Sequence, residues 1–397
     1  MHFIQKYNLI KIRFIILLLL KFFIVDNKYF LESFEKEKIF INLKQSFKIL
    51  SFKQIFNINI PNATVLIFEP NKHHHECIPG YTKYFIDLGY NVDILIHSSG
   101  LDSLMKFEKS ENIRLFIFND LFAIYLYIKV LCSIIRKYTF VLVQTVDANK
   151  LNLFYTLYNG LNLLKLNNSA FVFHDLNIID INYFHFFKEN RIWTLGNFSK
   201  GLQVNPHFFG NISIKDKNNK VIFFMTSTYN RNYKYLIESS ARLKNENFNF
   251  EIIITGRSSQ IKSYSIPENI KDIFIFKKKV TYYEMYKIIQ SSDFIIIPLK
   301  TNWKNDYEYK TNKVTGSIQI VYGFLKPAII HREFAKFYNL NDRNSLIFNN
   351  TNFYDIMKKS ILLNNTHYKN LQHNLQIVEK NLYQSSINNI KKTFHLF

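Results

Sequence analysis

Residues 63–97 decide the fold of this chain, and they read ATVLIFEPNKHHHECIPGYTKYFIDLGYNVDILIH. An apolar run over residues 63–68 predicts a buried β-strand, and a second run over residues 92–97 predicts another. Between them, a polar loop leads into residues 81–88, whose apolar residues recur at helical spacing. A strand, a helix and a second nearly unbroken apolar strand are typical of a parallel sheet covered by helices.

The same alternation continues along the chain in two series. The first series of predicted strands covers residues 63–68, 92–97, 113–118, 140–144, 170–173 and 192–195. The second covers residues 221–225, 250–255, 273–276, 294–298 and 328–331. Helices are expected between the strands of both series, for example at residues 150–164 in the first and 232–244 in the second. We therefore expect an α/β protein with two doubly wound Rossmann-like domains that face each other across a cleft.

The polar stretch of residues 211–219 marks the boundary between the two series. We expect an N-terminal helical extension at residues 1–61, a first Rossmann-like domain at 62–210, a second at 211–365 and a helical C-terminal segment at 366–397. Within the extension, residues 8–25 are apolar but contain Lys11, Arg13 and Lys21, so they are too interrupted to span a membrane. Two alternatives stay open for them: a basic helix lying on an anionic membrane surface, or a helix packed on the body of the protein.

The composition of the 397 residues is that of a folded protein with a basic surface. Hydrophobic residues make up 48% and charged residues 20%, which excludes an intrinsically disordered chain. Lysine and arginine number 51 against 30 acidic residues, and the net charge of +21 attracts nucleic acids, anionic membranes or phosphorylated small molecules. No RNA-binding or zinc-finger pattern accompanies this charge, so nucleic acid is not an expected partner. The two cysteines, Cys77 and Cys132, lack the spacing of a zinc site or a disulfide framework and fit a reducing, cytoplasmic location.

Ligands of open α/β sheets bind at the carboxyl ends of the strands, so the loops there hold the candidate site residues. After the first strand, His75 and Glu76 precede Gly80 at a helix start. Gly80 lets a ligand approach backbone N–H groups, and Glu76 with one of the histidines 73–75 is expected to line the cleft as an acid/base group. Consecutive residues of a loop do not all point at one centre, so a metal site here is disfavoured.

A second candidate group follows the predicted strand at residues 170–173. His174 and Asp175 come directly after it and place a titratable pair at a carboxyl end. We interpret the pair as catalytic, and a satisfied structural histidine is the alternative.

The loop after the strand at residues 221–225 is the most specific polar constellation of the chain. Hydroxyls, backbone donors and a guanidinium at a helix start favour a diphosphate, because arginine binds phosphate oxygens bidentately. The candidate donor-binding residues of this loop are Thr226, Ser227, Arg231 and Lys234. The loop at residues 300–317 adds Glu308, Lys313 and Ser317 as further phosphate and sugar contacts. Ordinary solvated loops are the alternative, and neither the Walker pattern nor G-x-G-x-x-G after a strand occurs.

In the order and spacing of these segments, the chain resembles the two-Rossmann (GT-B) glycosyltransferases, particularly the retaining enzymes that make bacterial polysaccharides and glycolipids. The segments that carry the resemblance are 79–92 (PGYTKYFIDLGYNV), 171–175 (FVFHD), 224–243, 252–256 (IIITG), 280–298 and 326–330 (KPAII). Together they extend over roughly residues 63 to 350.

The resemblance implies transfer of a sugar from a nucleotide-diphosphate-sugar donor, held mainly by the second domain, to a glycan or lipid-linked acceptor, held mainly by the first. On this interpretation His174, Asp175 and Glu76 are catalytic, and His75 and Gly80 contact the acceptor. Arg231 falls where the family places a basic residue on the donor diphosphate, so cationic side chains stabilise the leaving nucleotide and no metal or other cofactor is expected. We expect a cytoplasmic enzyme of cell-envelope synthesis, peripheral at the inner face of the membrane.

Two departures from the family pattern leave alternatives open. The pair of glutamates that precedes the later strand in the retaining enzymes falls at Asn312 and Ile320, and neither is acidic. The glycine after the third strand of the second domain is replaced by the lysines 277–279. Retention or inversion at the anomeric carbon therefore stays open, and so does a non-catalytic sugar-nucleotide or glycan-binding protein of the same fold.

Overall fold

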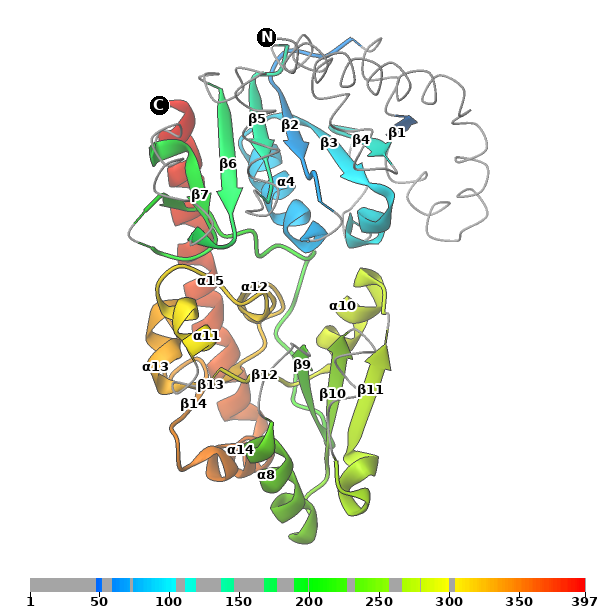
Figure 1. The fold of residues 1–397 in the computed structure, drawn as a ribbon, viewed down its shortest axis with the longest axis vertical. Coiled ribbons are helices and arrows are strands. Elements are labelled where there is room, and N and C mark those ends of the chain that lie inside the picture. Colours follow the sequence, from blue (N-terminus) through cyan, green and yellow to red (C-terminus); the bar gives the residue numbers. More distant parts are fainter. Residues whose placement is uncertain are drawn as a thin grey trace, which may run out of the picture.

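The computed structural model describes residues 48–51, 59–71, 74–104, 111–118, 137–145, 168–176, 189–198, 200–226, 233–256, 266–278, 280–299 and 304–396. Within them, the chain forms two parallel β-sheets with helices packed on them, one sheet in each half of the molecule (Figure 1). This arrangement confirms the expected α/β class with two Rossmann-like domains.

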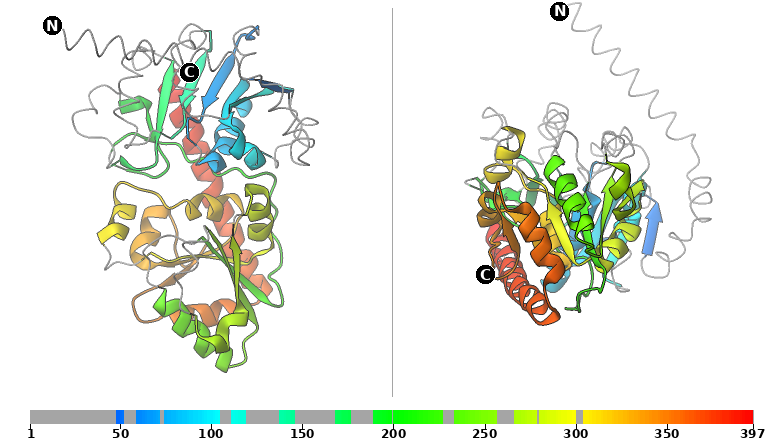
Figure 2. Two further views of the ribbon diagram at one scale, coloured as in Figure 1. Left: turned by 45° about the vertical axis from the view of Figure 1, so that its right-hand side comes forward. Right: turned by 90° about the horizontal axis from the view of Figure 1, so that it is seen from below.

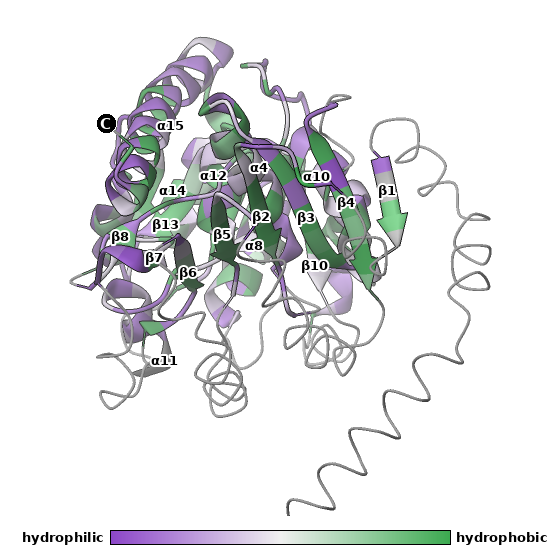
Figure 3. Ribbon diagram, turned by 90° about the horizontal axis from the view of Figure 1, so that it is seen from above, coloured by the Kyte–Doolittle hydropathy of each residue, from purple (hydrophilic) through white to green (hydrophobic). Residues whose placement is uncertain are grey.

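The first sheet has eight strands within the described residues, and all of its pairs are parallel. They are β1 (Lys48–Ser51), β2 (Thr64–Phe68), β3 (Asn91–His97), β4 (Ile113–Phe118), β5 (Phe140–Val143), β6 (Ser169–Phe173), β7 (Ile192–Thr194) and β8 (Leu202–Gln203). Their spatial order is β1-β4-β3-β2-β5-β6-β7-β8. The strands β2, β5 and β6 are buried along their whole length because both faces of the sheet are covered, and Figure 3 shows their apolar character in green.

The second sheet contains six parallel strands within the described residues, in the order β11-β10-β9-β12-β13-β14. They are β9 (Val221–Thr226), β10 (Phe250–Gly256), β11 (Phe274–Lys278), β12 (Phe294–Ile297), β13 (Ala328–His331) and β14 (Leu346–Phe348). The chain order reverses between β2 and β5 in the first sheet and between β9 and β12 in the second. Open sheets bind their ligands at such reversals.

The carboxyl edges of the two sheets face each other. Figure 1 shows the arrowheads of β2 and β6 pointing towards the second domain, whereas those of β10 and β11 point towards the first. This orientation agrees with the expectation of two domains that meet at the ligand-binding ends of their strands.

Helices connect the strands, and two of them, α4 and α8, overlap the helices predicted at residues 81–88 and 232–244. They are α4 (Ile78–Asp87), α8 (Lys234–Asn245), α10 (Tyr282–Ser291), α11 (Lys304–Tyr307), α12 (Ser317–Gly323), α13 (Arg332–Ala335), α14 (Phe353–Leu362) and α15 (Asn365–Phe394). The start of α10 is fixed by a capping box in which Thr281 and Glu284 each accept a backbone N–H of the other. No helix in the described part of the chain is long and apolar enough to cross a membrane. The helix predicted at residues 150–164 lies outside the described residues.

The long helix α15 joins the two halves (Figures 1 and 2). Near its start, the hydroxyl of Tyr368 donates to the backbone oxygen of Asp293, beside β12 of the second sheet, over 2.9 Å. Near its end, Thr393 accepts the indole N–H of Trp193 from β7 of the first sheet, also over 2.9 Å. The final aromatic ring of the helix, Phe394, lies with its centroid 4.0 Å from that of Phe140. The C-terminal helix therefore packs against both sheets.

Three short strands were not predicted from the sequence, and one of them corrects the expected helical extension. Residues 48–51 form β1, which pairs with β4 at the edge of the first sheet. The tetrapeptide KILS is too short to show a strand pattern, and β8 and β14 have the same difficulty. Residues 8–25, for which the sequence predicts a surface helix, lie outside the described residues.

Candidate active site

Three neighbouring strands of the first sheet end in polar residues that contact one another. Glu69 follows β2, Thr145 comes just after β5, and His174 follows β6. The hydroxyl oxygen of Thr145 lies 2.8 Å from Oε2 of Glu69 and 3.2 Å from Nε2 of His174. This chain of contacts stands at the reversal between β2 and β5, where a ligand site is expected.

Glu69 is held in place by backbone and side-chain donors. Its carboxyl group is fully buried, and its Oε1 accepts the backbone N–H of Asn71 over 2.7 Å. The side-chain amide of Asn71 in turn donates to the backbone oxygen of Thr145 over 2.9 Å, and it thereby supports Thr145 in a left-handed conformation with φ 56°. Burial raises the pKa of Glu69 well above 4.5, although the hydrogen bonds from Asn71 and Thr145 act in the opposite direction.

His174 is half-buried beside the ring of His74, and the two ring centroids are 4.1 Å apart. Burial lowers the pKa of His174 well below 6.5, and the nearby His74 lowers it further, against an opposing effect of Glu76. At neutral pH the imidazole is therefore uncharged and has one nitrogen free of a proton. Such a group can serve as a general base for a hydroxyl.

Glu76 connects His74 to the second domain. Its Oε1 lies 3.3 Å from Nδ1 of His74, and its Oε2 accepts the phenol of Tyr282 over 3.0 Å. Burial favours a raised pKa, but the hydrogen bond and charge of His74 outweigh it and lower the pKa of Glu76 from 4.5 to about 2. An ionised carboxylate with these partners is suited to positioning His74.

A second contact across the domain boundary involves the start of α10. The backbone N–H of Tyr282 donates to Oδ2 of Asp102, a residue that follows β3 in the first sheet. A carboxylate at the first turn of a helix interacts favourably with the unsatisfied N–H groups and the helix dipole. Burial raises the pKa of Asp102, while the backbone hydrogen bonds from Tyr282 and Tyr283 lower it.

Asp175 contacts the second domain directly. Its Oδ2 lies 3.2 Å from Nζ of Lys313, and the two residues form an antiparallel β-bridge. The backbone N–H of Leu176 donates to the oxygen of Asn312 over 2.9 Å, which strengthens the same contact. Burial lowers the pKa of Lys313, but Tyr309 and Asp175 outweigh this effect and raise it. The cation of Lys313 is thus brought to the residue next to His174.

The second sheet contributes hydroxyls at its own reversal. Thr226 ends β9 and Ser317 begins α12, and their hydroxyl oxygens are 3.3 Å apart. Ser227 and Arg231 lie outside the described residues. The side chain of Lys234 is 74% exposed and pairs with Glu238 of its own helix at 3.6 Å. Two of the predicted hydroxyls therefore come together, and the predicted contact of Lys234 with the donor stays a prediction.

Glu308 stands at the turn before Lys313. Its backbone oxygen accepts the N–H groups of Thr311, Asn312 and Lys313, at 3.1, 2.9 and 3.0 Å respectively. The residue thereby shapes the loop that presents Lys313. Its predicted contact with the donor stays a prediction.

The predicted acceptor contacts His75 and Gly80 are both buried in packing contacts. A Cβ atom added to Gly80 would lie 2.4 Å from Cα of Pro206, so the connecting segment between the domains requires a glycine here. The ring of His75 packs under Gly100, where an added Cβ would lie 2.2 Å from it, and its Nε2 lies 3.0 Å from the backbone oxygen of Asn71. These contacts give both residues a structural role, and their predicted contact with an acceptor stays a prediction.

Five residues of this region were not predicted individually from the sequence: Glu69, His74, Thr145, Asp102 and Tyr282. Glu69 and Thr145 stand at strand ends, so a stricter application of the strand-end rule selects them. His74 lies inside the run of histidines 73–75, whose members carry no individual signal in the sequence. Asp102 and Tyr282 meet only through the packing of the two domains, for which the sequence carries no local signal.

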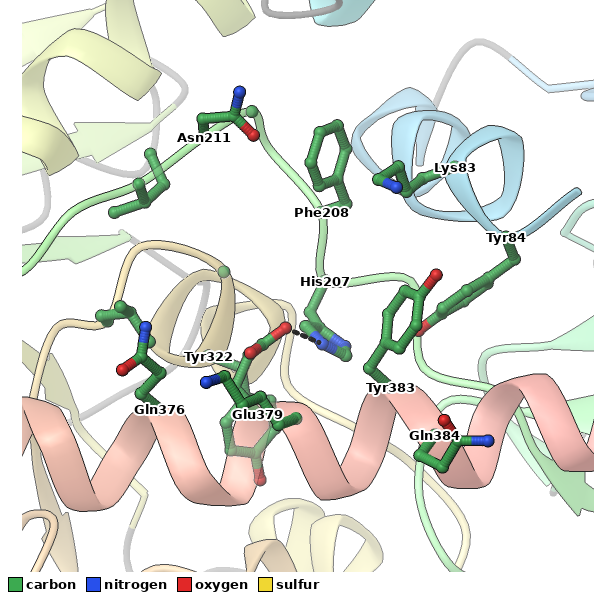
Figure 4. Close-up of a pocket in the computed structure, with 15 residues that line it drawn as sticks. Lys83, Tyr84, His207, Phe208, Asn211, Tyr322, Gln376, Glu379, Tyr383 and Gln384 are labelled. Carbon is green, nitrogen blue, oxygen red and sulfur yellow. Dashed lines mark hydrogen bonds and ion pairs between the residues drawn. The ribbon is translucent and has the colours of Figure 1, made fainter. Parts of the chain in front are cut away.

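A cavity of about 510 Å³ is lined by residues other than those described above (Figure 4). Its lining comes from α4, the connecting segment after β8, α12 and α15, and includes Lys83, His207, Tyr322 and Glu379. The imidazole of His207 contacts Glu379 at 3.1 Å, as the dashed line in Figure 4 shows. None of the predicted site residues lines this cavity.

Metal ligands do not gather in the described part of the chain. No group of three or more histidine, cysteine, aspartate or glutamate side chains there is arranged to hold a metal ion. His73 lies outside the described residues.

The two facing Rossmann-like domains, with polar residues at both reversals, have the GT-B fold. Among solved structures, the chain is similar to HepE from Anabaena in complex with UDP-glucose, with 10% identity, 84% of this chain and 100% of HepE covered, and a TM-score of 0.51. It is also similar to BGT of phage T4 in complex with UDP-glucose, at 15% identity and a TM-score of 0.47. This match covers 84% of this chain and 100% of BGT. A third similar structure is MnaA from S. aureus with UDP, at 13% identity and a TM-score of 0.46. This match covers 84% of this chain and 97% of MnaA. Comparisons with protein-family models and with curated proteins find no match.

Proposed function

We propose that the chain is a glycosyltransferase that moves a sugar from a nucleotide-diphosphate-sugar donor to a hydroxyl of a glycan or lipid-linked acceptor. The observation that carries the proposal is the position of the half-buried His174 at the carboxyl end of β6, with Lys313 of the second domain held next to it by Asp175. The GT-B fold supports the proposal by analogy.

The reaction needs a base on one side and a cation on the other. As the acceptor oxygen attacks the anomeric carbon, its proton passes to His174, and the nucleotide diphosphate leaves with the electron pair of the broken bond. Lys313 and Arg231 would stabilise the charge of the leaving diphosphate, and the hydroxyls of Thr226, Ser227 and Ser317 would hydrogen-bond its oxygens.

A uridine nucleotide is the first donor to test, because HepE was determined in complex with UDP-glucose. The net charge of +21 and the lysines within the apolar residues 8–25 support an acceptor carried at an anionic membrane, as in polysaccharide or glycolipid synthesis. Sedimentation of the full chain with anionic vesicles tests this point. Replacing Lys11, Arg13 and Lys21 by serine is expected to reduce pelleting, and equal pelleting would exclude a membrane role for this segment.

The main experiment measures thermal stability and turnover in turn. A nucleotide sugar that binds the folded protein raises the melting temperature, so UDP, UDP-glucose and a panel of other nucleotide sugars identify the donor. Release of free nucleotide from that donor, abolished in His174→Ala, is the expected result. Binding without release would favour the non-catalytic sugar-nucleotide-binding protein. Absence of binding to every nucleotide sugar would overturn the proposal.

A further inference from the structure

The carboxyl group of Glu69 has no part in the mechanism above, although it is fully buried at the centre of the site. Its Oε2 lies 2.8 Å from the hydroxyl of Thr145, and that hydroxyl lies 3.2 Å from Nε2 of His174. The three residues come from the ends of three adjacent strands, so the sheet itself fixes their spacing. A buried carboxyl linked to a histidine through one hydroxyl constrains where the histidine carries its proton.

We infer that Glu69 acts through Thr145 as a positioning residue that selects the tautomer of His174, with the proton on Nε2 and the lone pair on Nδ1. The tautomer assignment stands on the hydrogen-bond geometry and applies while Glu69 is ionised. Its catalytic consequence rests on the proposed function.

The single proton of the Thr145 hydroxyl links the state of Glu69 to the tautomer of His174. An ionised Glu69 can only accept, so Thr145 donates its proton to Oε2. The oxygen of Thr145 then has only lone pairs left for His174, so Nε2 must carry a proton and donate it. The other ring nitrogen, Nδ1, keeps its lone pair and is the atom that takes the proton of the acceptor hydroxyl.

Protonation of Glu69 reverses the direction of both hydrogen bonds, the one between Glu69 and Thr145 and the one between Thr145 and His174. Oε1 already accepts the N–H of Asn71, so the added proton stands on Oε2 and points at Thr145. Thr145 then donates to Nε2 of His174, and the neutral ring must carry its proton on Nδ1. In this state Nδ1 is a hydrogen-bond donor, and His174 cannot act as a base from that atom.

The charged and titratable groups around Glu69 and His174 set the pH at which the two hydrogen bonds change direction. Glu69 faces Glu76, and the charge of Glu76 raises the pKa of Glu69. Glu69 also faces the buried groups Cys77 and Tyr81. His174 faces His74 and Glu76, and its sequence neighbour Asp175 is paired with Lys313. Because burial raises the pKa of Glu69, we expect the hydrogen bonds to change direction at a pH well above the range in which carboxyl groups usually titrate.

Three variants separate positioning from a structural role. In Glu69→Gln, the amide oxygen can still accept from Asn71, so the amide N–H points at Thr145 and forces the reversed direction at every pH. Thr145→Val removes the hydroxyl and disconnects Glu69 from His174, while the valine side chain has about the size of the threonine side chain. Thr145→Ser keeps a hydroxyl and is the matched control, because it preserves the connection.

The tautomer is measured directly by NMR of the full chain labelled with ¹⁵N-histidine, with the His174 signals assigned from a His174→Gln sample. We expect the parent and Thr145→Ser to change from the Nδ1–H to the Nε2–H tautomer as the pH rises through the raised pKa of Glu69, whereas Glu69→Gln stays Nδ1–H throughout. Thr145→Val is expected to lose the pH-dependent change. Identical tautomers in the parent and Glu69→Gln at all pH values would overturn the inference, whether or not the protein transfers sugar.

The kinetic measurement tests the catalytic consequence. We expect kcat of Glu69→Gln to fall about 100-fold at the pH optimum of the parent, with donor affinity and melting temperature unchanged. The ascending limb of the parent pH profile should be missing in Glu69→Gln and Thr145→Val and present in Thr145→Ser. An unchanged kcat in Glu69→Gln, with the tautomer change confirmed by NMR, would show that His174 is not the base. Absence of turnover in the parent would count against the proposed function and leave the NMR result to decide the tautomer.

Discussion

The phenol of Tyr282 in the second domain donates a hydrogen bond to Glu76 of the first domain, with the two oxygen atoms 3.0 Å apart. Glu76 also contacts His74, whose ring lies against His174. The start of α10 is bound to Asp102 of the first domain in the same region. The position of the second domain is therefore coupled, through a short series of contacts, to the orientation of the proposed base.

Replacing Tyr282 by phenylalanine tests this coupling. The change keeps the ring and removes the hydroxyl, so Glu76 and His74 lose the bond that fixes them from the second domain. We expect kcat to fall about tenfold, the equivalent of about 1.4 kcal/mol for a hydrogen bond to a charged group. Tyr283→Phe is the matched control on the next residue. Parent-like kinetics in Tyr282→Phe would show that the contact does not position the site.

The lowered pKa of Glu76 predicts a specific sensitivity to acid. Its pKa is about 2 in the folded protein against 4.5 ordinarily, so the ionised form stabilises the fold at any pH above about 4.5. This stabilisation, about 3 kcal/mol, is lost as the pH falls from about 5 towards 2. Melting temperatures measured across this range should fall more steeply for the parent than for Glu76→Gln. Parallel curves would mean that the carboxylate is not held by His74 and Tyr282 as described.

The alternation of apolar strands and helices predicted the fold well because parallel strands are buried on both faces. The strand Ile113–Phe118 has the boundaries that the apolar run predicts, and so does Ala328–His331. Strands that the pattern missed, such as Leu202–Gln203, are too short to show a period and exist only because a longer neighbour pairs with them. Local sequence carries no record of such a partner.

The site was predicted less completely, and for a related reason. The rule that ligands bind at strand ends found His174 and Asp175, since each follows an obvious strand. Thr226 and Ser317 were found in the same way and are in contact. The link from Glu69 to His174 depends on which strands are neighbours in space, and β2, β5 and β6 are far apart in the sequence. Contacts such as that between Tyr282 and Glu76 depend further on how the two domains pack.

The attachment of α15 to the first sheet gives a prediction about stability. Thr393 is buried and accepts the indole N–H of Trp193, so Thr393→Val leaves that N–H without its acceptor. A buried donor without a partner costs about 1–3 kcal/mol. Urea unfolding followed by tryptophan fluorescence should show the loss. The exposed Thr366→Val on the same helix is the control, and an equal effect of the two substitutions would contradict the assigned role of Thr393.

The donor site can be tested by comparing the effects of substituting Arg231 and Lys234 on binding of the nucleoside diphosphate. Both were predicted from the sequence to bind the donor diphosphate, but Lys234 points outwards and pairs with Glu238. We expect Arg231→Ala to weaken binding of the nucleotide diphosphate about tenfold or more, because a charge-assisted bidentate contact is lost, and to leave the melting temperature of the free protein unchanged. Lys234→Ala should change the affinity by less than about twofold, as is usual for an exposed surface charge. Titration calorimetry with the free nucleoside diphosphate measures both. If Lys234→Ala weakens binding and Arg231→Ala does not, the phosphate site lies on the outer face of α8 and the assignment of the loop after β9 is wrong.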